Sequence, residues 1–278
     1  MLNNQIKALI SLLSEKNSKN LTVIKNRLIE LKPDSLPFLQ DALTHENPKI
    51  QNEVSSILEE VRLQHLTRLW IAFASCKDEL DLEEGSFLYS SYAFPRLEVQ
   101  VYRRTLNQWA DELKTLLKSN RPTVKPFQAV LDFFFHTLGF TGNKENYHDP
   151  QNSYLPAVID TKRGLPITLS VIFLLITNRL NLPFFPIGMP GHFIVKYQAE
   201  RENFYIDPFN GGKILTRQDC IDFLTQAGYG YRVEYLQTTG HRAILERMLR
   251  NLAAEYSRDN QSSAVSYISK LIEILHRP

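Results

Sequence analysis

The chain has 278 residues, of which 43% are hydrophobic, and its formal net charge at pH 7 is +2. That length supports one large domain or two to three small ones, with a sizeable core. The near-balanced charge gives no electrostatic case for binding nucleic acid. The two cysteines, Cys76 and Cys220, cannot make a disulfide framework and suit a reducing compartment.

Targeting signals are not evident in the sequence. Residues 1–20 lack a long apolar stretch and a small-residue cleavage site, so no signal peptide is predicted. The longest apolar run, residues 171–176, is too short to span a bilayer. We therefore expect a soluble, cytoplasmic protein with no membrane partner.

Residues 1–65 are predicted to be a helical hairpin. Two apolar stripes with helical spacing lie within residues 35–61, one on each side of the turn HENP. Asn47 is expected to be an N-cap, with Pro48 as the first helical residue. The pair resembles a single HEAT-type repeat unit that packs on the segment after it, and an ordinary helical hairpin fits the pattern equally.

The middle of the chain continues the helical pattern. Residues 66–138 are predicted to be amphipathic helices, broken at Pro and Gly, that pack on the core. Residues 141–155 are polar and rich in asparagine, which indicates a loop. Pro166 then opens an apolar helix that should end near Asn181, before Pro183.

After this helix the pattern changes to short strands bounded by turns. The segments FPIGMP, HFIVKYQ and NFYIDPF each predict a strand, and YGYRVEYL could be one more. Thr216 is predicted as the N-cap of a helix, with Asp219 as its capping-box partner and Gly228 as its stop. Residues 241–278 predict two amphipathic helices, a pair that is similar to a tetratricopeptide unit.

Two of the predicted strands carry a histidine and an aspartate. His192 opens the strand in GMPGHFIVKY, and Asp207 closes the next strand in FYIDPFNGG. A catalytic His–Asp pair is often arranged on neighbouring strands, so we predict that the two side chains lie within roughly 2.6–3.2 Å. The pair could equally be architectural, and Asp207 could simply start a turn, since Asp-Pro and Asn-Gly are turn formers.

An apolar helix followed by strands bearing His and Asp resembles the papain-like core of the transglutaminase-like superfamily. The motifs DPQNSYL, RGLPITLS, PGHF and IDPFNGG make the chain similar to the bacterial SirB-type family, over roughly residues 66–275. The resemblance implies an α+β fold, in which a papain/transglutaminase-like core over residues 139–240 has a short antiparallel sheet and is flanked by mainly α-helical segments. It implies no settled reaction.

In that superfamily a cysteine nucleophile lies at the N-terminus of the helix, with a His base and an Asp that orients it. The resemblance assigns these last two roles to His192 and Asp207, but it places Pro166 where the cysteine would be. Ser170 is about 40° round the helix from Pro166 and about 6 Å further along its axis, which makes it a poor substitute.

We therefore expect a transglutaminase-like protein without the cysteine nucleophile, which acts as a non-catalytic module that binds or scaffolds a protein or peptide. Cys76 and Cys220 fall in other predicted helices, where inert thiols are the simpler interpretation. The alternative is a hydrolase or amide-transfer enzyme, in which His192 is the general base, Asp207 orients it, and water or Ser170 is the nucleophile. That alternative requires His192 to face an open pocket.

Several side chains are expected to face one shared cleft. They come from the asparagine-rich loop, the start of the apolar helix, the two strands and the turn after Asp207: Asn152, Ser153, Tyr154, Pro166, His192, Asp207, Phe209 and Asn210. Free N–H groups at the helix start would favour an acidic or carbonyl-bearing segment of a partner. The histidines show no spacing typical of a zinc site, so we expect no metal and no cofactor.

Overall fold

The structure is a computed structural model that describes the chain apart from residues 1, 16, 77, 120–124, 201–202 and 277–278. The chain divides into two compact units, Met1–Leu69 and Trp70–Pro278. The first unit is helical and contains α1 (Leu2–Ser11), α2 (Ser18–Glu30), α3 (Ser35–Asp41) and the first part of α4 (Pro48–Ala74).

The first unit has an apolar core of its own. Leu13, Leu28 and Val54 are fully buried in it. The predicted start of α4 is confirmed, because Pro48 opens the helix and the Asn47 side chain accepts a hydrogen bond from the Lys49 N–H at 3.0 Å.

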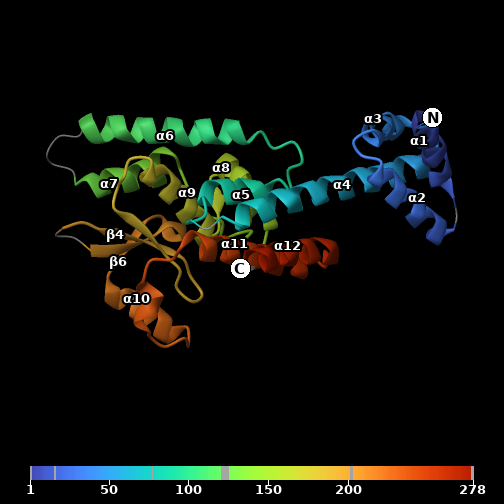
Figure 1. The fold of residues 1–278 in the computed structure, drawn as a ribbon. Helices are drawn as coiled ribbons and strands as arrows, with labels where there is room; N and C mark the ends of the chain where they lie inside the picture. The colour runs from blue at the N-terminus through green and yellow to red at the C-terminus, as the bar shows by residue number, and fades with distance from the viewer. Residues whose placement is uncertain (1, 16, 77, 120–124, 201–202, 277–278) are drawn as a thin grey trace. The chain divides into compact units, whose positions relative to one another are not determined.

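The second unit carries the remaining elements, shown from cyan to red in Figure 1. Its α-helices are α5 (Leu82–Ser90), α6 (Val99–Ser119), α7 (Pro126–Leu131), α8 (Leu155–Thr161), α9 (Pro166–Asn178), α10 (Arg217–Gln226), α11 (His241–Arg258) and α12 (Ser262–Leu275). A π-helical turn, Asp132–Thr137, continues α7, and short 3₁₀ turns occur at Pro150–Ser153, Pro208–Asn210 and Val233–Leu236. Helices α11 and α12 pack against each other.

The strands form one antiparallel sheet and one short parallel pair. The sheet has the order β3-β4-β5-β6 and contains β3 (Phe184–Ile187), β4 (Ile194–Gln198), β5 (Asn203–Asp207) and β6 (Lys213–Leu215). The parallel pair is β1 (Thr141–Gly142) with β2 (Arg163–Gly164). The α+β fold class expected from the sequence is therefore confirmed.

Helices cover both faces of the antiparallel sheet. Helix α9 is buried along its length from Pro166 to Thr177, as its apolar sequence requires, and it packs on β3 and β4. Val195 and Ile206 share a core with α9, whereas the residues before them, Ile194 and Tyr205, share a different core with α10. Figure 1 shows α9 on one side of the sheet and α10 on the other.

Local predictions around the sheet were confirmed in part. Helix α9 opens at Pro166 as predicted but ends at Asn178, somewhat before Asn181. Thr216 and Asp219 form the predicted capping box at the start of α10.

The prediction of an additional strand at YGYRVEYL was wrong. Residues Val233–Leu236 form a 3₁₀ turn instead. Gly228 and Gly230 have φ values of 79° and 65°, so left-handed backbone interrupts the extended conformation before a strand can form. No helix among the described residues is long and apolar enough to cross a membrane.

Candidate functional site

A tight turn presents His192 at the start of β4. The turn has Pro190 at its second position and Gly191, with φ 74°, at its third, which is the signature of a type II turn. It is closed by a hydrogen bond from the His192 N–H to the Met189 carbonyl at 3.2 Å. His192 therefore lies just before β4 and not within the strand.

The expected contact between His192 and Asp207 is present. The His192 Nε2 atom lies 2.9 Å from Asp207 Oδ2. The same carboxylate oxygen accepts a hydrogen bond from the Asn210 side-chain amide at 2.7 Å, and Oδ1 accepts from the N–H groups of Phe209 and Asn210 at 3.1 and 3.2 Å. Asp207 therefore caps the turn that follows it and orients the imidazole as well.

This environment favours the ionised form of the Asp207 carboxylate. Burial alone would raise the pKa of Asp207, but the hydrogen bonds from His192 and Asn210 outweigh it and hold that pKa below its usual value. An ionised carboxylate can only accept hydrogen bonds, so the His192 Nε2 atom carries a proton. When the ring is neutral, its Nδ1 atom is a hydrogen-bond acceptor.

The His–Asp pair opens onto a pocket between the sheet and α10. Asp207 follows Tyr205 by two residues, so its side chain lies on the face of β5 that α10 covers. The pocket has a volume of about 590 Å³, which is within the usual range for ligand sites. Phe223 of α10 is 38% exposed, and its ring centroid lies 5.6 Å from that of His192.

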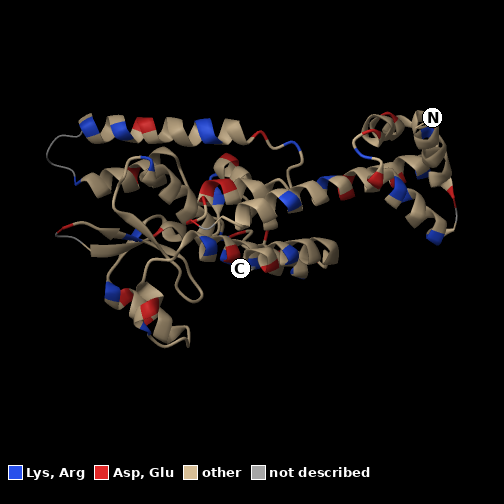
Figure 2. Ribbon diagram, viewed as in Figure 1, with Lys and Arg blue, Asp and Glu red and all other residues tan. Residues whose placement is uncertain are grey.

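The pocket is lined by more acidic than basic groups. Asp207, Asp219 and Asp222 contribute three carboxylates, against the single ammonium group of Lys213. Figure 2, viewed as in Figure 1, shows acidic residues on α10. The remaining lining residues are Met189, His192, Asn210, Leu215, Cys220, Phe223 and Gln226. Such a lining favours a ligand that is cationic or donates hydrogen bonds.

Sequence reasoning missed the side of the pocket formed by β6 and α10. Lys213 lies directly opposite Asp207 in the β5–β6 register, and residues paired in this way project from the same face of the sheet. The position of Lys213 opposite Asp207 could have been predicted from the hairpin sequence IDPFNGGK, because its tight turn sets that register. No comparable signal indicated that Asp222, Phe223 and Gln226 would face His192, since that depends on how α10 packs.

Part of the predicted cleft is packed protein instead. Asn152, Ser153 and Tyr154 are at most 3% exposed. The Asn152 side chain accepts a hydrogen bond from the Asn143 amide at 2.8 Å and donates to the Asn146 carbonyl at 2.6 Å. The expectation that these residues line an open cleft is corrected, because all three are buried and Asn152 holds the asparagine-rich loop together.

The tyrosine in this group is packed among other aromatic side chains. The Tyr154 hydroxyl pairs with that of Tyr256 at 2.7 Å, and burial raises the Tyr154 pKa. The Tyr89 hydroxyl donates to the Ser153 carbonyl at 2.7 Å. These contacts join α5, the loop and α11 into one core, so Tyr154 has a structural role.

The start of α9 is equally closed. Pro166 is buried, and Ser170 is 0% exposed with its hydroxyl donating to the Pro166 carbonyl at 2.8 Å. Ser170 cannot reach a bound substrate, which corrects its place among the candidate nucleophiles. Ile167 and Thr168 are also buried, so the helix start does not present free N–H groups to an acidic segment.

Phe209 also packs away from the pocket. Its ring lies 5.7 Å from that of Tyr147, and a Cβ atom on Gly142 would come within 2.4 Å of the Phe209 carbonyl. Glycine at position 142 therefore permits β1 to approach this turn closely. Of the expected cleft residues, His192, Asp207 and Asn210 meet at the pocket, and Phe209 does not line it.

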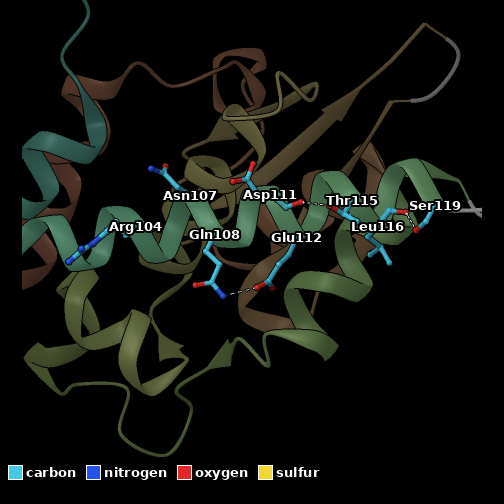
Figure 3. Close-up of a pocket in the computed structure, with 8 residues that line it drawn as sticks. All are labelled: Arg104, Asn107, Gln108, Asp111, Glu112, Thr115, Leu116 and Ser119. Carbon is cyan, nitrogen blue, oxygen red and sulfur yellow. Dashed lines mark hydrogen bonds between the residues drawn. The ribbon is translucent and has the colours of Figure 1, made fainter.

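Other candidate sites carry less chemistry. No three His, Cys, Asp or Glu side chains among the described residues are arranged to hold a metal ion. His148 contacts the Glu255 carboxylate at 3.1 Å. A larger hollow lies along α6, with Asn107, Gln108 and Glu112 among its residues, but all of its labelled side chains come from this one helix (Figure 3).

Comparisons with known proteins identify the family. A family model described as the transglutaminase-like superfamily matches residues 100–250. A "UPF0162 protein" of Xylella fastidiosa (strain 9a5c) is 31% identical over 206 residues, which cover 71% of this chain and 73% of the relative. The chain therefore belongs to the transglutaminase-like superfamily, and its similarity to the Xylella protein makes it a member of the UPF0162 family.

More distant relatives match a smaller part of the chain. A "UPF0162 protein" of Vibrio cholerae is 27% identical over 189 residues, covering 66% of this chain and 69% of the relative. The human "F-box only protein 21" is 29% identical over 137 residues, covering 45% of this chain and 21% of that protein. No solved structure matches the chain.

Proposed function

We propose that the pocket beside His192 and Asp207 binds a segment of a partner protein without chemically changing it. The observation that carries this proposal is an intact His–Asp pair that lines an open pocket while the candidate nucleophiles are unavailable. Pro166 has no nucleophilic group, and Ser170 is buried and hydrogen-bonded.

The cysteines do not replace the missing nucleophile. Cys220 lines the pocket, but its side chain is fully buried, and burial raises its thiol pKa to about 12. A protonated thiol is a poor nucleophile at neutral pH. Cys76 is exposed and is not among the residues that line the pocket.

The chemistry of the lining suggests a basic segment as the ligand. In a neutral His192 ring the Nδ1 atom can accept a hydrogen bond, and the Asp222 carboxylate is exposed at the pocket. Phe223 supplies an aromatic face on which an ammonium or guanidinium group can rest. A lysine or arginine side chain satisfies all three features, whereas a carboxylate would be repelled by the acidic lining.

A binding experiment with degenerate peptides tests this proposal. Three fluorescent pools that differ only in a fixed central residue, Lys, norleucine or Glu, are titrated against the protein and followed by anisotropy. We expect the Lys pool to bind most tightly, and His192→Ala to weaken it roughly tenfold through loss of a hydrogen bond to a charged group.

Two further variants control the interpretation. Asp222→Asn should reduce the preference for Lys over norleucine, because it removes a carboxylate from the pocket. Gln108→Ala, in the α6 hollow, should leave all three affinities unchanged. Tighter binding of the Glu pool, or equal binding of all pools by wild type and His192→Ala, would contradict the proposal.

The intact His–Asp pair supports a second candidate function. His192 Nδ1 could accept a proton from a bound water, which would make the protein a hydrolase or amide-transfer enzyme with Asp207 as orienter. Mass spectrometry of the Lys pool after incubation distinguishes the two functions. Products that form with wild type and disappear with His192→Ala would support the enzyme, and an unchanged pool supports the binding module.

The helical flanks fit a role in binding proteins. The resemblances to a HEAT-type unit in residues 1–65 and to a tetratricopeptide pair in residues 241–278 remain predictions, as does the narrower SirB-type family. Repeat units of both kinds are used as protein-binding surfaces, so these flanks support a protein partner in a cytoplasmic setting.

A further inference from the structure

Arg247 of α11 hydrogen-bonds to the backbone of the turn that presents His192. Arg247 donates one hydrogen bond from Nη1 to the Met189 carbonyl at 2.7 Å and another from Nη2 to the His192 carbonyl at 2.9 Å. Those two carbonyls belong to the first and last residues of the type II turn. The planar fork of the guanidinium therefore bridges both ends of the turn at once.

Additional contacts hold the arginine and the turn in place. The Arg247 guanidinium lies 5.6 Å from the centroid of the Phe193 ring, and burial lowers the Arg247 pKa. The Gly188 N–H donates to the Thr239 hydroxyl at 2.9 Å, just before the turn. A Cβ atom on Gly191 would meet the Tyr229 ring at 3.0 Å, so the other side of the turn is also confined.

We infer that Arg247 is a positioning residue, which holds the Met189–His192 turn so that His192 Nε2 stays within hydrogen-bond reach of Asp207. The pair is joined by one side-chain hydrogen bond of 2.9 Å, so a small movement of the turn would break it. Arg247 lies in α11, far from the pocket lining in sequence, and acts through the backbone of the turn. This inference rests on the proposed function only in one respect, which is that His192 is the residue that contacts the ligand.

The test measures the ionisation of Asp207, which a purely structural role of Arg247 would not change. Loss of the His192 hydrogen bond removes the strongest influence that lowers the Asp207 pKa. In Arg247→Met the midpoint of the Asp207 titration, followed by carboxyl ¹³C NMR, should therefore rise by about one pH unit. Arg247→Lys keeps the charge but cannot bridge both carbonyls, so its midpoint should lie between those of wild type and Arg247→Met.

A second arginine of α11 provides the matched control. Arg242 also donates to two backbone carbonyls, those of Leu275 at 2.6 Å and Ala74 at 3.0 Å, but neither belongs to the His192 turn. Arg242→Met should lower the melting temperature without moving the Asp207 midpoint.

The outcomes separate this inference from the proposed function, because no ligand binding is measured. A folded Arg247→Met protein with the wild-type Asp207 midpoint would overturn it, and so would an equal shift in Arg242→Met. If Arg247→Met does not fold, Arg247→Lys decides the question: a raised midpoint supports the positioning role, and a midpoint equal to that of wild type contradicts it.

Discussion

Asp207 is buried among four hydrogen-bond donors, and this environment favours its ionised form. The donors are His192 Nε2, the Asn210 amide and the N–H groups of Phe209 and Asn210. Each of them favours the ionised carboxylate, which explains why the Asp207 pKa is lowered although the residue is only 5% exposed.

The lowered pKa gives a prediction for stability. A carboxyl group whose pKa is depressed in the folded state stabilises the protein above its unfolded pKa, about 3.9, and loses that contribution as the pH falls through the folded value. We therefore expect Asp207→Asn to be less stable than wild type at neutral pH, with the difference shrinking below about pH 4. Urea unfolding between pH 6 and pH 2 measures it, and a difference that stays constant over that range would count against the assigned ionisation.

At the residue scale, the sequence located the His–Asp pair but not its surroundings. His192 and Asp207 could be paired because turn and strand signals on both sides of them set the antiparallel register. Asn152 was wrongly predicted to line the cleft. An asparagine that hydrogen-bonds within its own loop cannot be distinguished in the sequence from one that binds a ligand. Only the packing of that loop distinguishes the two roles.

At the scale of elements, α9 is the clearest case of sequence specifying structure. Pro166 starts it and its apolar residues make it a fully buried helix, both of which were predicted. The sequence did not show that His192 and Asp207 would face away from α9. Alternation along a strand tells which residues share a face, but which helix covers that face depends on tertiary packing.

Two hydroxyl groups in α9 give a prediction about its packing. The Thr168 hydroxyl is fully buried and has no hydrogen-bond partner among the described residues, whereas the Ser170 hydroxyl is satisfied by the Pro166 carbonyl. Thr168→Val keeps the shape and removes the unpaired group, so it should raise the free energy of unfolding by about 1 kcal/mol. The control, Ser170→Ala, should not raise it. Chemical denaturation would refute this account if Thr168→Val were destabilised instead.

At the scale of the whole molecule, the sequence and the structure divide the chain differently. Four segments were predicted, with the first ending at residue 65, and the structure divides into two compact units, with the chain boundary between Leu69 and Trp70. From Trp70 onward, the three remaining segments form one unit, because a single core joins α5, α8, α9, α11 and α12. Local periodicity identifies helices, but it does not report which of them share a core.

We propose that the pocket of His192 and Asp207 binds a basic segment and leaves it intact. The most direct measurement is an NMR titration of the ¹⁵N-labelled protein with the Lys-centred peptide pool, followed by mass spectrometry of the recovered peptide. We expect chemical-shift changes at His192, Lys213 and Phe223, none along the α6 hollow, and an unchanged peptide mass. Shifts confined to other surfaces, or a cleaved or modified peptide whose formation requires His192, would contradict it.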